Sequence, residues 1–278
     1  MQYSNPQIPE GINTSKTHPL KEFFWLSSGV IAVIVAALLI LILLSDLITG
    51  YIPFSVEKNL SIPDFPASYQ QGPMHQYLQT LTDRVTLAQQ LPDDMQINVH
   101  YIDNDTVNAF ATLGGNVYFF RGLLEKLPNE NALTMLIAHE VAHVKHRHPI
   151  KSTGRGIVLA LGLSLVSSTA GDALVDTILG GTTTLTVLKF TRDMENQADK
   201  TALQTVERIY GHLAGADGLF SALGETSNIE PPEFFSTHPL TEIRISAIQL
   251  KTTNQKDSHI TPLPEDYKGW LTTPDAPL

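Results

Sequence analysis

The sequence predicts an α+β fold in which a mostly helical domain with a small β-sheet follows one N-terminal transmembrane helix. Three observations predict it: an uncharged apolar run near the N-terminus, two stretches that alternate between apolar and polar residues, and helical spacing on both sides of those stretches. The chain has 278 residues, of which 42% are hydrophobic and 17% are charged. It is therefore long and apolar enough to bury a core.

The apolar run covers residues 23–44, FFWLSSGVIAVIVAALLILILL, and contains no charged side chain. A helix needs about 20 residues to cross a bilayer, whereas the apolar region of a cleaved signal peptide, the alternative, has about 7 to 15. We therefore expect an uncleaved anchor. Lys16 and Lys21 precede it, and the next lysine is Lys58. The positive-inside rule then places residues 1–22 in the cytoplasm and the bulk of the chain outside it.

Beyond the span, residues 45–73 are dense in Pro, Gly and Ser and are predicted to link the span to a folded domain at residues 74–250. In that domain, residues 75–90 carry apolar side chains at helical spacing. Residues 97–103 alternate and are β-branched, and residues 108–124 predict a strand, a Gly-Gly turn, a second strand and the start of a helix. This order of helix, small sheet and further helices is typical of an α+β domain.

The next helix is predicted to run from Glu130 to His148, and it contains four of the ten histidines of the chain. Asn129 can cap its first turn, and Pro149 is expected to end it. The histidines therefore lie in the second half of one continuous helix.

A second apolar stretch covers residues 156–190, but Asp172, Asp176 and several Ser, Thr and Gly residues interrupt it. Its longest apolar part, residues 157–166, is too short to cross a bilayer. We expect two core or shielding helices here, with a re-entrant or membrane-contacting hairpin as the alternative.

The last stretch, residues 251–278, is rich in proline and polar residues. It is predicted to be an extended tail. Tyr267 and Trp270 are the side chains through which such a tail could pack against the domain.

The composition excludes several classes of function. The formal net charge is −10 and the pI is about 5.4, so an acidic surface is expected to repel the phosphate backbone, and no nucleic-acid partner is predicted. The chain has no cysteine, which excludes disulfides, thiolate metal sites and a cysteine nucleophile.

The chemistry begins with the motif His139-Glu140-x-x-His143. Side chains four apart on a helix lie on one face, so two imidazoles can bind one metal ion. Glu140 projects beside that ion, in the position of a general base that acts on metal-bound water. Zinc fits best because it accepts imidazole and carboxylate ligands and activates water when one coordination position stays open.

A third ligand has two candidates. His146 shares the face of His143, but a straight helix carries it a further turn away. We expect His146, Arg147 and His148 only to end the helix, where positive charge is favourable.

The better candidate is Glu195 in the stretch TRDMENQADKTAL. Asp199 lies four residues later on the same face, so Glu195 can bind the metal while Asp199 accepts a hydrogen bond from the outer nitrogen of a ligand histidine. Ala198 leaves room for two helices to approach. Without the histidine motif, a solvated acidic helix face would be the preferred interpretation.

These residues, together with STHPLTEIR, which contains His238, Pro239 and Arg244, carry a family resemblance. The chain resembles the gluzincin zinc metallopeptidases that include HtpX, the CAAX prenyl endopeptidases and the BepA-like proteases. The block NAFATLGGNVYFFRGLL is similar to the segment that precedes the zinc helix in that family. The resemblance covers most of residues 108–245. It departs from HtpX-like enzymes, which have several membrane spans.

The resemblance implies a zincin-type domain with one Zn²⁺ per chain. It implies that His139, His143 and Glu195 are the zinc ligands and that Glu140 is the base. His238 and Arg244 match a further active-site pair of the family, in which the histidine approaches the zinc or the developing oxyanion.

The expected function is that of a zinc endopeptidase of the cell inner membrane, anchored by residues 23–44, with a periplasmic or otherwise extracytoplasmic catalytic domain. The expected substrates are unfolded or misfolded envelope proteins, because a strand of the hairpin within residues 108–120 could bind extended polypeptides through backbone hydrogen bonds. The alternative is a non-hydrolytic chaperone or adaptor module in which His238 fills the fourth position on the zinc.

Overall fold

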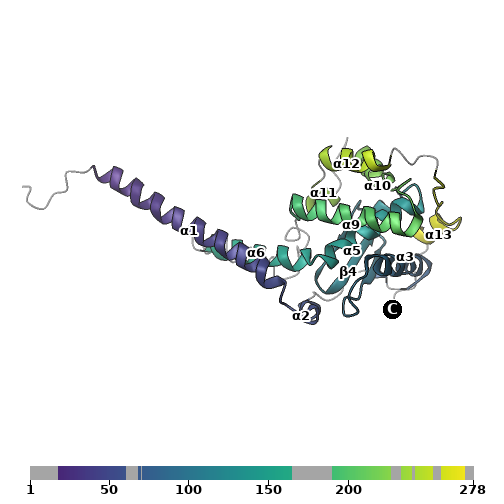
Figure 1. Ribbon diagram of the computed structural model, residues 1–278, viewed down its shortest axis with the longest axis horizontal. Coiled ribbons are helices and arrows are strands. Elements are labelled where there is room, and N and C mark those ends of the chain that lie inside the picture. Colours follow the sequence, from purple (N-terminus) through teal and green to yellow (C-terminus); the bar gives the residue numbers. More distant parts are fainter. Residues whose placement is uncertain are drawn as a thin grey trace, which may run out of the picture.

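The fold joins a long N-terminal helix to a domain in which helices pack on a small sheet (Figure 1). The computed structural model describes seven ranges: residues 18–60, 68–69, 71–164, 190–226, 233–239, 242–252 and 258–272. The predicted α+β architecture with a preceding apolar helix is confirmed.

The N-terminal helix, α1, runs from Pro19 to Thr49, beyond both ends of the predicted span. Among the described residues it is the one helix that is long and apolar enough to cross a membrane, and its most apolar part is not buried by the rest of the chain. In Figure 1 it extends away from the domain.

The segment predicted as a linker, residues 45–73, is not a plain linker. It contains the end of α1, a short helix α2 (Phe54–Asn59) and the strand β1 (Ser68–Tyr69). The Phe54 and Glu57 side chains of α2 are buried. Glu57 Oε2 accepts a hydrogen bond from Arg147 Nε at 2.7 Å, so the segment that follows α1 docks on the domain.

The sheet has four strands in the order β1-β2-β4-β3. The other three are β2 (Asn98–Ile102), β3 (Ala109–Ala111) and β4 (Asn116–Phe120). Strands β2 and β4 are parallel, whereas β3 pairs with β4 in an antiparallel hairpin. The hairpin turns through the 3₁₀ helix η1 (Leu113–Gly115), where Gly114 and Gly115 have φ of 76° and 82°, a conformation that favours glycine. The two predicted strand regions are confirmed.

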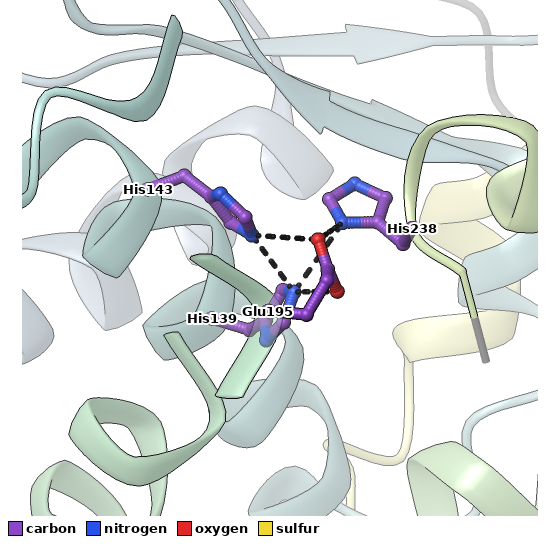
Figure 2. A group of neighbouring side chains, drawn as sticks. All are labelled: His139, His143, Glu195 and His238. Carbon is purple, nitrogen blue, oxygen red and sulfur yellow. Dashed lines mark hydrogen bonds and ion pairs between the residues drawn. The ribbon is translucent and has the colours of Figure 1, made fainter. Parts of the chain in front are cut away.

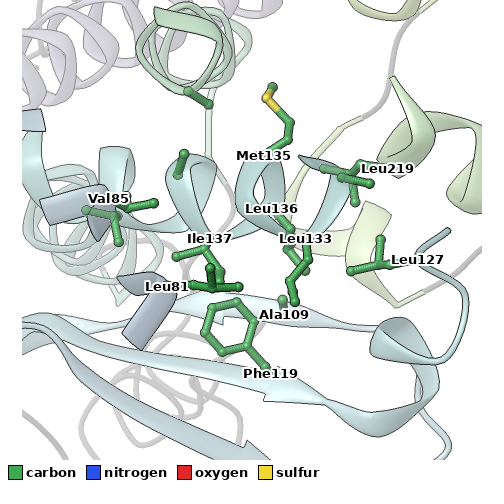
Figure 3. Close-up of a cluster of buried hydrophobic side chains, with 14 of the residues drawn as sticks. Leu81, Val85, Ala109, Phe119, Leu127, Leu133, Met135, Leu136, Ile137 and Leu219 are labelled. Atoms are coloured by element: carbon green, nitrogen blue, oxygen red, sulfur yellow. The ribbon is translucent and has the colours of Figure 1, made fainter. Parts of the chain in front are cut away.

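Helices cover the sheet and complete the domain. They are α3 (Pro73–Gln89), α4 (Arg121–Leu124), α5 (Glu130–Lys145), α6 (His148–Ser164), α9 (Arg192–Tyr210), α10 (Gly218–Thr226), α11 (Phe234–Thr237), α12 (Glu242–Thr252) and α13 (Tyr267–Thr272). The central helix is α5, which packs against the sheet, α3 and α9. Figure 3 shows Leu133 and Ile137 of α5 above Ala109 and Phe119 of the sheet.

The predicted helix from Glu130 to His148 is wrong at its C-terminal end, because α5 stops at Lys145. Arg147 has a φ of 58°, which interrupts the helical path. Pro149 does not end a helix; it lies in the first turn of α6, where its missing N–H group is not needed.

Helix α6 also differs from the expected core or shielding helix. It lies beside α1 and leads away from the domain (Figure 1). The remainder of the predicted second apolar stretch, residues 165–189, lies outside the described residues.

The C-terminal stretch is not an extended tail throughout, since α13 docks on the core. Tyr267 is 3% exposed and its hydroxyl donates to the Leu124 carbonyl oxygen at 3.1 Å. The Trp270 ring packs on Tyr77, with 5.6 Å between the ring centroids. The predicted packing through Tyr267 and Trp270 is therefore confirmed.

Candidate metal centre

The buried helix α5 and the buried face of α9 supply three side chains of the site, His139, His143 and Glu195. On α5, Asn129 caps the first turn by accepting a hydrogen bond from the Ala132 N–H at 2.8 Å. His139 and His143 follow one turn apart in the buried second half. On α9, Thr191 is the capping residue and Glu195 lies in the first turn.

These side chains converge on one point, and a histidine from a loop joins them (Figure 2). His139 Nε2 lies 3.0 Å from His143 Nε2 and 3.5 Å from Glu195 Oε2. His143 Nε2 is 3.5 Å from Glu195 Oε1. His238, at the end of α11, places Nδ1 3.1 Å from Glu195 Oε1 and 3.4 Å from His139 Nε2. All four side chains are buried.

The spacing of these atoms fits a zinc ion. Two ligand atoms on a tetrahedral zinc, each bonded at about 2.0–2.1 Å, lie about 3.3–3.4 Å apart. The separations of 3.0–3.5 Å in the cluster bracket that value. The donor set of imidazole nitrogens and carboxylate oxygens is also one that zinc accepts.

The protonation states of His143 and Glu195 suit metal binding, whereas His139 must lose a proton before it can bind a metal. Burial lowers the pKa of His143 well below its usual value, so this ring is neutral. Burial would raise the pKa of Glu195, but His238 and His139 outweigh it and hold that pKa well below its usual range. Burial would lower the pKa of His139, yet Asp199 and Glu195 raise it to about 10. A proton and a metal cation therefore compete for His139.

Asp199 and Arg244 contact the clustered side chains from outside. Asp199 Oδ1 lies 3.0 Å from His139 Nδ1, the nitrogen that faces away from the cluster. Arg244 holds both Asp199 oxygens, with Nε at 2.7 Å from Oδ2 and Nη2 at 2.9 Å from Oδ1. Its Nη1 lies 2.7 Å from Glu195 Oε2. Arg244 thus contacts two carboxylates of the site and is suited to position them.

His148 differs from the sequence-based expectation that it merely ends a helix. Its side chain is fully buried, and its Nδ1 lies 3.0 Å from His143 Nδ1. Its Nε2 lies 3.1 Å from Gln197 Oε1. Burial lowers the pKa of His148 to about 3, so the ring is neutral.

These contacts fix a tautomer by elimination. Gln197 Oε1 can only accept, so the proton of neutral His148 resides on Nε2 and Nδ1 is left as an acceptor. His143 therefore donates from Nδ1 and keeps the lone pair of Nε2 directed at the cluster. His146, in contrast, contacts Thr201 Oγ1 at 2.8 Å and touches no ligand atom. Helical spacing could not predict that His148, and not His146, contacts His143. The helix breaks at Arg147, so the spacing of one continuous helix does not apply beyond that residue.

Glu140 is buried beside the cluster. Among the described residues, neither of its carboxylate oxygens has a hydrogen-bond partner, and His238 Nε2 lies 3.6 Å from Oε1. Burial raises the pKa of this carboxyl group. The Ala111 backbone N–H and the two neighbouring histidines only partly offset the effect of burial. A buried carboxylate with so few donors is costly, so this position is suited to a group that takes up and releases a proton.

Aromatic rings pack against two of the imidazoles and hold their planes in place. The His143 ring stacks on Phe190 with 3.9 Å between centroids. The His238 ring stacks on Phe234 at 4.4 Å. The Phe234 N–H donates to the Val107 carbonyl oxygen at 3.2 Å, which ties α11 to the residues that lead into β3. Strand β3 is the edge of the sheet and packs against α5.

Comparison with known proteins finds one peptidase family model and several relatives that are named as proteases. The family model described as "Peptidase family M48" matches residues 73–252. A beta-barrel assembly-enhancing protease of Yersinia pestis is 29% identical over 233 residues, which is 77% of this chain and 47% of the relative. The protein of the same name from Escherichia coli (strain K12) is 31% identical over 178 residues, 60% of this chain and 36% of the relative.

A mitochondrial protein is similar as well. The mitochondrial metalloendopeptidase OMA1 of Saccharomyces cerevisiae is 27% identical over 168 residues, 56% of this chain and 47% of the relative. The chain spans less than half the length of each of these three relatives.

Proposed function

Because the chain belongs to peptidase family M48, we propose that it is a membrane-anchored zinc endopeptidase. The observation that carries the proposal is the convergence of His139, His143 and Glu195, with ligand atoms 3.0–3.5 Å apart in a buried site. These three residues hold the zinc ion, with Asp199 and Arg244 positioning them. Zinc bound there polarises a substrate carbonyl and lowers the pKa of water.

Glu140 is the general base. Its buried carboxylate, which has no hydrogen-bond partner among the described residues, accepts a proton from the attacking water and delivers it to the leaving amine. Burial raises its pKa, which favours uptake of the proton from the water. The neighbouring His238 Nε2, 3.6 Å away, faces the same space.

His238 closes the resting site in this proposal. Its Nδ1 lies 3.1 Å from Glu195 Oε1 and 3.4 Å from His139 Nε2, within the 3.0–3.5 Å range of the other separations, so it would be a fourth ligand that a substrate must displace. Once displaced, its imidazole is near enough to the reaction to stabilise an oxyanion.

The substrates are extended polypeptides. Strand β3 is the sheet edge beside α5, and an edge strand can pair with an added strand through backbone groups. Such pairing depends on few side chains of the substrate, so the site could accept many sequences. This broad specificity is suited to unfolded or misfolded envelope proteins. The relatives named as proteases support peptide bonds as the target.

The anchor is α1, with residues 1–22 in the cytoplasm and the catalytic domain outside it. Lys16 and Lys21 lie close before the span, whereas the first lysine after it is Lys58, and this asymmetry supports the orientation. A reporter fused after Lys58 should be active outside the cytoplasm; cytoplasmic activity contradicts the orientation.

The direct test compares the full chain with Glu140→Gln in casein cleavage. We expect a loss of about 10²- to 10⁴-fold in kcat, the usual contribution of a general base, with zinc content unchanged. Glu207→Gln, at an exposed position of α9, is the matched control and should cleave normally. Equal cleavage by wild type and Glu140→Gln would contradict the proposal.

A second candidate function is supported by the position of His238: a permanently plugged zinc module that acts as a chaperone or adaptor. The His238→Ala variant separates the two functions. If the plug is a resting state, removing it changes the cleavage rate, upward when displacement limits turnover and downward when oxyanion stabilisation does. A chain that does not cleave casein with or without His238, yet retains zinc, fits the module.

A further inference from the structure

Buried and exposed side chains alternate along the second half of α6. Val158, Ala160 and Gly162 are buried. The alternating residues are apolar and exposed: Ile157 (40%), Leu159 (50%), Leu161 (53%) and Leu163 (46%). A helix that is apolar on all sides is suited to a core or to a membrane rather than to water, and this half of α6 lies outside the core of the domain (Figure 1).

Gly154 and Gly162, which lie on one side of α6, pack on α1. A side-chain Cβ added at Gly162 would lie 2.9 Å from both terminal methyl groups of Leu38, and one added at Gly154 would meet Ser45 Oγ. On α1, a partly covered stripe consists of Ile34, Leu38, Ile42 and Ser45, while the residues between them are exposed. The two helices therefore run antiparallel in close contact, and glycine at position 162 permits it.

The last charged residue before the uncharged part of each helix lies at the same height along the helix pair. Arg155 Nε of α6 donates to Asp46 Oδ1 of α1 at 2.9 Å. Beyond this pair, residues 156–164 of α6 carry no charge, and neither do residues 23–45 of α1. The ion pair therefore marks a common boundary, and the exposed leucines of α6 continue the exposed apolar surface of α1.

We propose that residues 156–164 of α6 insert into the lipid bilayer beside α1, a proposal that rests on the proposed role of α1 as a membrane anchor. From Asp46 to Leu38, the partner of Gly162, is eight residues, or about 12 Å of helix. This is less than half of the roughly 30 Å hydrocarbon core. The described part of α6 thus lies within one leaflet, below the Asp46–Arg155 pair.

The insertion ties the metal centre to the membrane surface. Helix α6 begins at His148, the residue whose ring contacts His143. The same helix reaches the lipid within about two turns, at Gly156. The substrate segments that meet the site first are therefore those close to the bilayer, such as the membrane-proximal parts of unfolded membrane proteins.

Single cysteines test the insertion, because the chain has none of its own. The full chain carrying Leu161→Cys is labelled with a small fluorophore and reconstituted in phosphatidylcholine vesicles whose acyl chains are brominated. Leu39→Cys, at an exposed position of α1, is the membrane control. Leu87→Cys, at an 81% exposed position of α3, is the water control. Leu159→Cys repeats the measurement if the first variant fails to reconstitute.

We expect the label at position 161 to lose fluorescence to the brominated lipid to the same extent as the label at position 39, and the label at position 87 to lose none. If position 39 is quenched while positions 161 and 159 are not, the insertion is overturned and the anchor stands. If position 39 is also unquenched, the anchor fails, and the insertion fails with it. Neither outcome depends on proteolytic activity.

Discussion

Helices α5 and α6 follow one another in the chain and have almost the same length, 16 and 17 residues, but they are solvated differently. Every residue of α5 from Asn131 to Val144 is buried among the sheet, α3 and α9. The second half of α6 leaves every other side chain exposed and has α1 beside it. The apolar residues therefore have different roles in the two helices. In α5 they surround the buried histidines and Glu140 with a core of low dielectric constant, where charges interact strongly. In α6 they form an exposed apolar surface.

The largest loss of stability is expected from a substitution at the junction between α5 and α6. Arg147 pairs with Glu57, which is fully buried. Arg147→Ala leaves that carboxyl with the Gly114 N–H alone, at 3.4 Å. Removing one partner of a buried pair costs about 3–5 kcal/mol, and we expect that loss in the unfolding of the detergent-solubilised chain. Arg155→Ala breaks a partly exposed pair with Asp46 and should cost about 0–1 kcal/mol.

This loss should depend on pH. Burial already raises the pKa of Glu57, with Arg147 acting against it, so the variant raises it further. A carboxyl group whose pKa is higher in the folded state stabilises the fold below its unfolded pKa, and this contribution is lost as pH rises through the folded pKa. The cost of Arg147→Ala should therefore shrink as the pH is lowered towards the unfolded pKa of Glu57. A cost that grows on acidification would contradict the buried pair.

Truncating one leucine in each helix sharpens the comparison. Leu136 of α5 is fully buried, so Leu136→Ala should destabilise the chain by about 2–5 kcal/mol through lost burial and a cavity. Leu161→Ala removes the same atoms from a side chain that is 53% exposed and should change stability in detergent by about 0.5 kcal/mol or less. Thermal unfolding of both variants provides the measurement, and equal losses would place α6 in a packed core.

A smaller effect is expected at the first residue of α6. His148→Ala removes the acceptor for His143 Nδ1, and loss of such an outer partner typically lowers metal affinity by about 10- to 100-fold. Competition with a zinc chelator measures it. His146→Ala is the matched control, because that ring contacts Thr201 rather than a ligand. If both variants release zinc equally, the role assigned to His148 is wrong.

Much of the fold followed from local patterns. Short stretches of the sequence were enough to predict the strand regions, the helix cap at Asn129 and the apolar N-terminal helix. The order of the motifs identified the family. A spacing of four residues places His139 beside His143, and likewise Glu195 beside Asp199, since a helix fixes those separations.

What the sequence did not predict depends on contacts between distant residues. The end of α5 is set by the backbone of Arg147 in a left-handed conformation, anchored by Glu57 from another helix. Pro149, expected as a helix stop, is equally compatible with a helix start. The apolar run of α6 does not indicate whether protein or lipid covers it, because a core helix and a membrane helix can have the same hydropathy. Only the packing on α1 separates these alternatives.

The central claim is that the buried cluster on α5 and α9 binds a catalytic zinc ion. The most direct measurement is the zinc content of the purified full chain, followed by casein cleavage after chelation and after zinc is returned, with His139→Ala alongside. We predict one zinc per chain, cleavage that disappears on chelation and returns with zinc, and neither zinc nor cleavage in His139→Ala. Cleavage that continues after the zinc is removed would contradict the claim.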